Sequence, residues 1–240
     1  MTRPVPEQAE LTSDDANTIL AVAAHELKNA LGGIGVALAR CELRLRSSQA
    51  VTAEDIAAAR VELRRLSALV NDLLDGARVD LGAVEVQPQS IDLGKLTGEV
   101  VEMFRAARDQ TVILQVPSLP LIVDADPDRV RAVLINYLEN AVKYAGDSHA
   151  LSVTVGPSPV GGRARIAVTD QGPGIRPEDQ PRLFQRFFRA PGVAKRTEGL
   201  GLGLFLCRSI AEAHHGAAGV DSQPGAGATF WLDLPLPAAT

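Results

Sequence analysis

His25, Glu26 and Asn29 form the first group of residues whose types and spacing could do chemistry. His25 is followed directly by Glu26, and Asn29 lies four residues after the histidine, one helical turn further along the same face. An imidazole beside a carboxylate is a candidate nucleophile, because the acid can fix the ring tautomer and stabilise charge on the ring. A surface histidine on a bundle helix is the alternative, and these residues alone favour it.

Two amides mark the second group. Asn136 and Asn140 are four residues apart, so both side chains point the same way from one helix, and Lys143 is a near neighbour of Asn140. Amide oxygens suit a hard cation such as Mg²⁺, and a lysine suits a phosphate. An ordinary solvated helix face would have the same composition.

Asp170 opens a third group, which follows an alternating apolar strand. Gly172 and Gly174 come next, and two glycines spaced in this way let the backbone approach a flat ligand closely. The carboxylate could accept a hydrogen bond from an exocyclic amine. A plain Gly-Pro turn after a strand would also account for the pattern.

A second glycine run leads directly into a helix and contains Gly199, Gly201 and Gly203. Free N–H groups and the dipole at a helix N-terminus favour anions, so this run could hold phosphates. It is not a Walker A loop, because no Gly-Lys-Ser/Thr is present, and it does not follow a strand as a Rossmann motif would. The Phe- and Arg-rich stretch at 184–189 suits a lid over such a site.

The first third of the chain must position the histidine. Apolar or small residues recur at alternating spacings of four and three along a predicted helix that ends near residue 47, at Leu20, Ala24, Leu27, Leu31, Ile34, Leu38, Cys41 and Leu45. A second helix follows a capping box of Thr52 and Asp55, and repeats every seven residues at Ile56, Leu63, Val70 and Ala77, with Leu66 and Leu73 in the other register. Such a hairpin has too few faces to hide both seams, so we predict a homodimeric four-helix bundle.

The remainder of the chain reads as α/β. We predict helices near 93–108, 127–144 and 202–214, with Gly216 ending the last one. Strands are expected near 91–93, 112–116, 121–123, 151–155, 165–169, 219–221 and 229–234. The predicted domains are therefore a flexible tail at 1–11, a helical hairpin at 12–82 and an α/β domain at 83–240.

Composition narrows the class of protein. The chain has 240 residues, a net charge of −5 and no basic stripe, so nucleic acid is not expected as a partner. Cys41 and Cys207 each lie in an apolar helical pattern and read as buried thiols in a reducing compartment. No apolar run is long enough to insert in a membrane, and the first ten residues lack the core of a signal peptide, so a cytoplasmic protein is expected.

The order and spacing of these motifs resemble a bacterial two-component sensor histidine kinase. Six segments carry the resemblance: the phosphoacceptor box at 25–31, the Mg-ATP box at 136–144, the adenine-binding box at 170–175, the phenylalanine box at 184–189, the second glycine box at 199–204 and the closing strand motif at 225–230. The resemblance implies that the hairpin forms a dimeric bundle. It also implies that the second half is the GHKL-type (Bergerat) α/β sandwich shared with gyrase, Hsp90 and MutL-type ATPases.

By this resemblance, the second half binds ATP and Mg²⁺. Asn140 would ligate Mg²⁺ with the support of Asn136, Lys143 would contact phosphate, and Tyr144 would lie against the adenine. Asp170 would hold the adenine amine, and the remaining predicted nucleotide-binding residues are Gly172, Gly174, Gly199, Gly201, Gly203 and Thr229. Relatives that hydrolyse ATP carry a glutamate at the position of Asn136, and an asparagine cannot activate water.

The implied activity is ATP-dependent autophosphorylation on His25 and transfer to an aspartate of a response regulator. Asn29 matches the position that often directs water to dephosphorylate the regulator, although Ala30 replaces the frequent proline, which predicts an unkinked first helix. Ala228 stands where Ser or Thr is frequent. No sensor domain is recognisable, so we expect either that a separate sensor protein supplies the input or that the chain acts as a phosphorelay component. A phosphotransfer adaptor, an anti-sigma-type serine kinase and a pure ATPase clamp are the alternatives.

Overall fold

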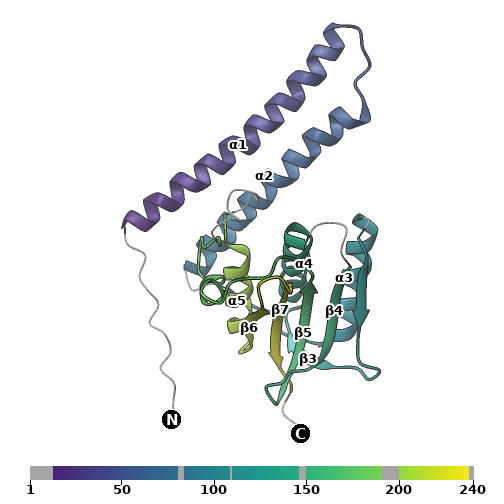
Figure 1. Cartoon of the computed structure of the whole chain (residues 1–240), viewed down its shortest axis with the longest axis vertical. Helices are drawn as coiled ribbons and strands as arrows, with labels where there is room; N and C mark the ends of the chain where they lie inside the picture. The colour runs from purple at the N-terminus through teal and green to yellow at the C-terminus, as the bar shows by residue number, and fades with distance from the viewer. Residues whose placement is uncertain (1–12, 81–83, 109, 146–149, 191–199, 238–240) are drawn as a thin grey trace. The chain divides into compact units, whose positions relative to one another are not determined.

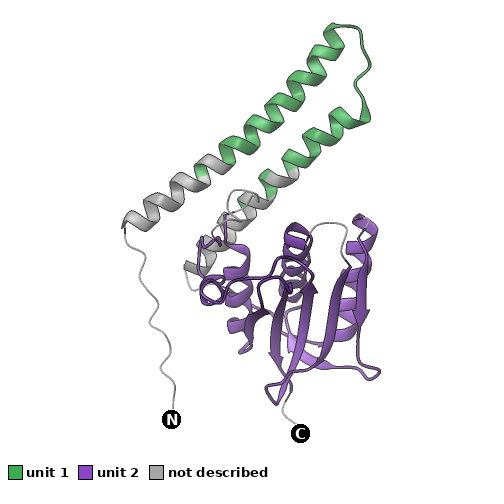
Figure 2. Cartoon of the chain, in the orientation of Figure 1, with its two compact units in different colours: residues 1–74 green, residues 75–240 purple. Residues whose placement is uncertain are grey.

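The computed structural model describes residues 13–80, 84–108, 110–145, 150–190 and 200–237. The chain divides into two compact units, residues 1–74 and 75–240, as Figure 2 shows. The predicted tail at 1–11 lies outside the described residues. No described helix is both long and apolar enough to cross a bilayer.

Two helices form the hairpin, α1 (Ser13–Arg46) and α2 (Ala53–Asp80) (Figure 1). The predicted capping box starts α2: the Thr52 N–H donates to Asp55 Oδ2 at 2.9 Å, and the Asp55 N–H donates to Thr52 Oγ1 at 3.3 Å. Asp55 is buried and also meets Arg40 and Arg44, whose Nε atoms lie 2.7 and 2.9 Å from its carboxylate oxygens. The connection between the helices is therefore held by a buried carboxylate with charged partners.

The predicted apolar seam is only partly the face that the two helices share. Ala30 and Ala37 are buried, whereas Leu31, Leu38 and Leu45 are 57%, 53% and 65% exposed. On α2 the seven-residue repeat is likewise exposed at Ile56, Leu63 and Val70. These larger apolar side chains form a separate stripe, which stays largely exposed in the described part of the chain. Cys41 is half-buried rather than buried as predicted, while Cys207 is buried as predicted.

The second unit contains a mixed five-stranded sheet with the order β2-β4-β5-β7-β6. Its strands are β2 (Val112–Gln115), β4 (Leu151–Pro157), β5 (Arg163–Asp170), β6 (Ala217–Ser222) and β7 (Ala228–Pro235). β2 and β4 are parallel and the other pairs are antiparallel. A separate antiparallel pair consists of β1 (Gln89–Asp92) and β3 (Ile122–Ala125).

Three helices form the second layer of this unit: α3 (Leu93–Ala107), α4 (Pro127–Ala145) and α5 (Gly203–Ala213) (Figure 1). Their apolar faces pack on alternate residues of the sheet, such as Ile166 and Val168 of β5. Tyr137 of α4 is buried, and its hydroxyl donates to the carbonyl of Trp231 in β7 at 3.1 Å. The predicted α/β sandwich is confirmed, and each predicted helix and strand is present within a few residues.

The end of α5 differs from the prediction in its detail. His215, not Gly216, has the positive φ that ends the helix, at 55°. Gly216 is needed for a close approach instead, because a Cβ there would stand 2.1 Å from the Asp233 carbonyl oxygen. His214 is buried: its Nδ1 lies 2.8 Å from the Ile210 carbonyl oxygen, and its Nε2 accepts the Asp126 N–H at 2.9 Å. The end of α5 is thereby tied to the start of α4.

Candidate active site

The amides of α4 are paired as predicted. Asp126 caps the helix through the N–H groups of Asp128 and Arg129, and one side of α4 is buried against the sheet. On another side, Asn140 Nδ2 donates to Asn136 Oδ1 at 3.0 Å. Asn140 Oδ1 makes no hydrogen bond with any described residue. An amide oxygen held in this way is a suitable ligand for Mg²⁺, with Asn136 acting as its support.

The first turn of α5 lies directly against Asn136. A Cβ at Gly203 would stand 2.2 Å from Asn136 Nδ2, so any other residue would force the Asn136 amide to shift. Gly201 adopts a φ of 72° between the buried side chains of Leu200 and Leu202, which anchor the turn that precedes the helix. The N-terminus of α5 and the paired amides therefore meet, which the spacing alone did not reveal. Gly199 lies outside the described residues.

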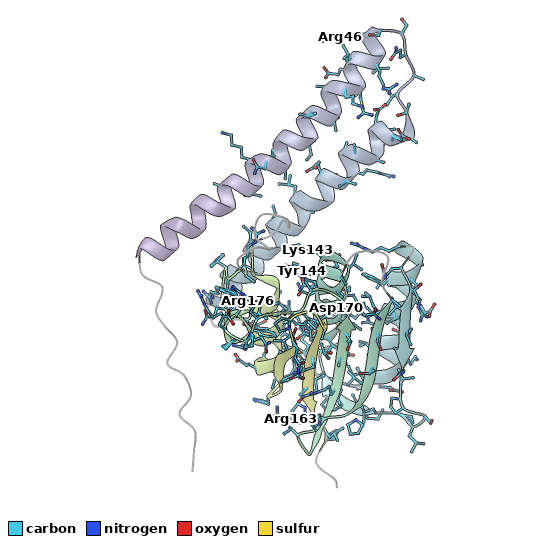
Figure 3. All side chains as sticks on the ribbon, in the orientation of Figure 1. Arg46, Lys143, Tyr144, Arg163, Asp170 and Arg176 are labelled. Carbon is cyan, nitrogen blue, oxygen red and sulfur yellow. The ribbon has the colours of Figure 1, made fainter. Side chains whose placement is uncertain are left out.

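Asp170 ends β5 and lies at the same end of the domain as the last turn of α4 (Figure 3). Its Oδ1 accepts the N–H groups of Gly172 at 2.7 Å and Ala228 at 3.3 Å. Burial raises the pKa of this carboxyl, and the two N–H donors oppose that rise. Oδ2 accepts no hydrogen bond from a described residue, so it is the oxygen left for a donor from a ligand.

The last turn of α4 meets the glycine loop that follows Asp170. A Cβ at Gly172 would stand 3.3 Å from the Tyr144 carbonyl oxygen. Lys143 and Tyr144 are exposed there, with Lys143 Nζ 5.4 Å from the Tyr144 ring centroid (Figure 3). Gly203 therefore approaches α4 at Asn136 and Gly172 approaches it at Tyr144, two turns apart.

Thr229 is the predicted residue that the structure does not bring to this cluster through its side chain. Its hydroxyl pairs with that of Thr169 at 2.9 Å. Because side chains alternate along a strand, this pair lies on the face of the sheet opposite to Asp170 and Ala228. Ala228 contributes to the site with its backbone N–H.

The phenylalanine stretch packs against the start of α5. Phe184 is buried beneath Arg208, whose guanidinium carbon lies 4.6 Å from the ring centroid. Phe187 donates its N–H to the Gly201 carbonyl at 3.1 Å and has a φ of 59°. A bulky residue in this conformation marks local strain, here beside the glycine turn.

The predicted phosphoacceptor group lies on α1, which runs as one helix through Ala30. Ala30 is fully buried in the hairpin, and Asn29 is exposed. The side chains of His25 and Glu26 lie outside the described residues, so their predicted geometry stays a prediction. Two side chains near Asp170, Ser222 and Gln180, bind its loop and were missed, because no local pattern singles them out.

Two families match the two parts of the chain. Residues 15–82 match the His Kinase A (phospho-acceptor) domain, and residues 125–238 match the Histidine kinase-, DNA gyrase B-, and HSP90-like ATPase. The Adaptive-response sensory kinase SasA of Thermosynechococcus vestitus is 36% identical over 228 residues, which cover 91% of this chain and 59% of that protein. The chain thus spans just over half the length of this relative.

Solved structures agree with these matches. Full-length ShkA in complex with AMPPNP has a TM-score of 0.65 and 28% identity, and the match covers 93% of this chain and 46% of that one. Histidine kinase ThkA in complex with response regulator protein TrrA has a TM-score of 0.67 at 22% identity, with 93% and 63% covered, and shares the fold. With both domains in the predicted order and the site residues on the expected elements, the chain belongs to the two-component sensor histidine kinase family.

Proposed function

We propose that this chain is an ATP-dependent protein histidine kinase that phosphorylates itself on His25 and passes the phosphoryl group to an aspartate of a response regulator. The observation that carries the proposal is that both glycine motifs approach α4 closely, one at Asn136 and the other at Tyr144. Two glycine motifs that are far apart in sequence thereby meet the asparagine motif on one helix, which supports a nucleotide site there.

The base and the phosphates of ATP would meet different residues. Asp170 Oδ2 accepts the exocyclic amine of adenine, and Tyr144 lies against the ring. Lys143 and the backbone of Gly201 and Gly203 hold the phosphates. Asn140 Oδ1 holds a Mg²⁺ ion, which neutralises phosphate charge when it is bound.

Residues of α1 carry out the phosphoryl transfer. An imidazole nitrogen of His25 attacks the γ-phosphorus in line, so that an N–P bond forms while the bond from phosphorus to the ADP oxygen breaks. Glu26 orients the ring and assists the removal of the ring proton. The phosphoryl group then passes to an aspartate oxygen of the response regulator, and Asn29 positions water for the opposing phosphatase reaction. A histidine kinase of the same fold is known in complex with a response regulator protein, which supports this class of partner.

The exposed stripe of the hairpin supports a homodimer. Leu31, Leu38 and Leu45 of α1 and Ile56 and Leu63 of α2 are all more than half exposed in the single chain. A second copy would cover them in a four-helix bundle. We propose that residues 12–82 form this phosphotransfer domain and that residues 83–240 form the ATP-binding domain.

The test is incubation of the purified chain with γ-labelled Mg-ATP beside the His25→Ala and Asn140→Ala variants. The expected result is label that is acid-labile and alkali-stable on the wild type and absent from both variants. Absence of both label and ATP binding would favour a phosphotransfer adaptor. Acid-stable label that survives in the His25 variant would favour a serine kinase.

A further inference from the structure

Ser222, at the end of β6, joins two segments that flank Asp170. Its hydroxyl accepts the Ile175 N–H at 2.9 Å and donates to the Gly227 carbonyl at 2.6 Å. Ile175 follows the glycine loop that begins at Gly172, and Gly227 directly precedes β7. One hydroxyl therefore connects the loop after Asp170 with the start of the neighbouring strand.

Gln180 completes a closed set of contacts with the same residues. It begins the short 3-10 helix η1 (Gln180–Arg182), and its Nε2 donates to the Ile175 carbonyl at 3.0 Å and to the Ser222 carbonyl at 2.9 Å. Both backbone groups of Ile175 are thus held by side chains. We name Ser222 and Gln180 the loop brace.

The loop brace joins the two segments that supply the donors to Asp170. The Gly172 N–H comes from the loop, and the Ala228 N–H comes from β7, and both reach Asp170 Oδ1. The segments are also tightly packed, since a Cβ at Gly227 would stand 2.0 Å from the Asp170 carbonyl oxygen. A displacement of either segment would therefore change the direction in which Asp170 Oδ2 faces.

We propose that Ser222 and Gln180 are positioning residues that set the base preference of the nucleotide site, by fixing the loop and the strand that orient Asp170. The inference rests on the proposed function, in which Asp170 accepts the adenine amine. Loss of either brace side chain leaves an Ile175 backbone group without its partner and frees the loop to move. The contact with the amine then weakens, while phosphate binding by other elements remains.

The experiment compares the dissociation constants of Mg-ATP and Mg-ITP, because inosine carries an oxygen where adenine carries the amine. The full chain is measured as wild type, Ser222→Ala, Ser222→Thr and Gln180→Met, each with its thermal unfolding. Ser209→Ala is the matched control, since among the described residues its hydroxyl bonds only to the Phe205 carbonyl of its own helix. We expect the ATP-to-ITP preference to fall about tenfold in Ser222→Ala and Gln180→Met and to be kept in Ser222→Thr and the control.

Two results would overturn the inference, and a third would also contradict part of the proposed function. An unchanged preference in Ser222→Ala and Gln180→Met would refute a role for the loop brace. An equal loss of ATP and ITP affinity would show a purely structural role and would refute it too. A wild type without any preference for ATP over ITP would contradict the role of Asp170 itself, and with it that part of the proposed function.

Discussion

Replacing Asp170 with asparagine should remove the preference of the site for adenine without unfolding the protein. Oδ1 is fixed as an acceptor by the N–H groups of Gly172 and Ala228, so the asparagine oxygen must occupy that position. Its amide nitrogen then stands where Oδ2 stood and presents a donor to the adenine amine, which is itself a donor. A hydrogen bond to a charged group contributes roughly 1.5–3 kcal/mol, so ATP affinity should fall at least about tenfold.

The fold should survive this change, because Asp170 is only 4% exposed and carries a charge that burial disfavours. Burial raises the pKa of its carboxyl, which means that the folded state holds a proton more tightly than the unfolded chain does. Acidification from neutral pH toward the ordinary aspartate range therefore stabilises the wild type at this group, and that contribution is lost as pH rises through the raised pKa. Asp170→Asn removes this pH dependence and should melt no lower than the wild type at neutral pH.

The same protonation acts on binding with the opposite sign. When Asp170 is protonated, Oδ2 no longer accepts the adenine amine. As the pH is lowered, the ATP-to-ITP preference of the wild type should therefore begin to fall before the pH reaches the ordinary aspartate range, because burial raises the pKa of this carboxyl. Calorimetric titration with Mg-ATP and Mg-ITP across pH measures it, and Asp124→Asn on the exposed side of β3 is the control. If Asp170→Asn keeps the wild-type preference at neutral pH, the hydrogen-bond assignment at this carboxylate is wrong.

Three further changes test other parts of the structure. Gly203→Ala places a methyl group 2.2 Å from Asn136 Nδ2 and should lower ATP affinity at least about tenfold in calorimetry. Arg165→Met leaves the buried Asp233 without its two guanidinium hydrogen bonds and should lower the free energy of unfolding by about 3 kcal/mol in denaturant titrations. Leu38→Glu adds a charge to the exposed stripe of α1 and should convert a dimer to a monomer in analytical ultracentrifugation.

Each of these changes has a matched control in the chain. Gly156→Ala adds a methyl group with no atom within 4 Å and should leave ATP affinity unchanged. Arg163→Met alters another arginine of β5, for which the described residues provide no ion pair with a buried acid. Val36→Glu charges a different face of α1 and should keep the dimer. If a control variant shows the same loss as its test variant, the structural assignment behind that pair of variants is wrong.

Local patterns predicted most of the elements and the pairing of two amides on α4. The i, i+4 spacing of Asn136 and Asn140 predicted a pair of amides on one face, because both lie in a single helix. The strand alternation around Val168 predicted β5 in the same way. The strand order β2-β4-β5-β7-β6 carries no local signal, since it depends on which distant strands pair.

The hairpin seam shows a different limit of sequence reasoning. A seven-residue apolar repeat predicts that one face of a helix packs against another helix. It does not distinguish a partner helix in the same chain from one in a second chain. Here Ala30 and Ala37 are buried, while Leu31 and Leu38 remain exposed. The repeat alone therefore does not tell which of its residues the single chain covers.

Long-range polar contacts escaped prediction because their partners lie far apart in sequence. Ser222 is 47 residues from Ile175, and its serine is an ordinary strand-end residue when read locally. His214 reads as a basic residue at a helix end, yet it accepts a hydrogen bond from Asp126, 88 residues earlier. Only the folded arrangement shows that these side chains hold the elements around the site.

Asn136 connects the geometry of the site to the kind of transfer that it supports. Its Oδ1 accepts from Asn140, and its Nδ2 faces the first turn of α5 at Gly203. A neutral amide with its oxygen occupied in this way cannot take a proton from water, so it cannot prepare water to attack a phosphate. In the proposed function the nucleophile comes instead from another element, as His25 of α1.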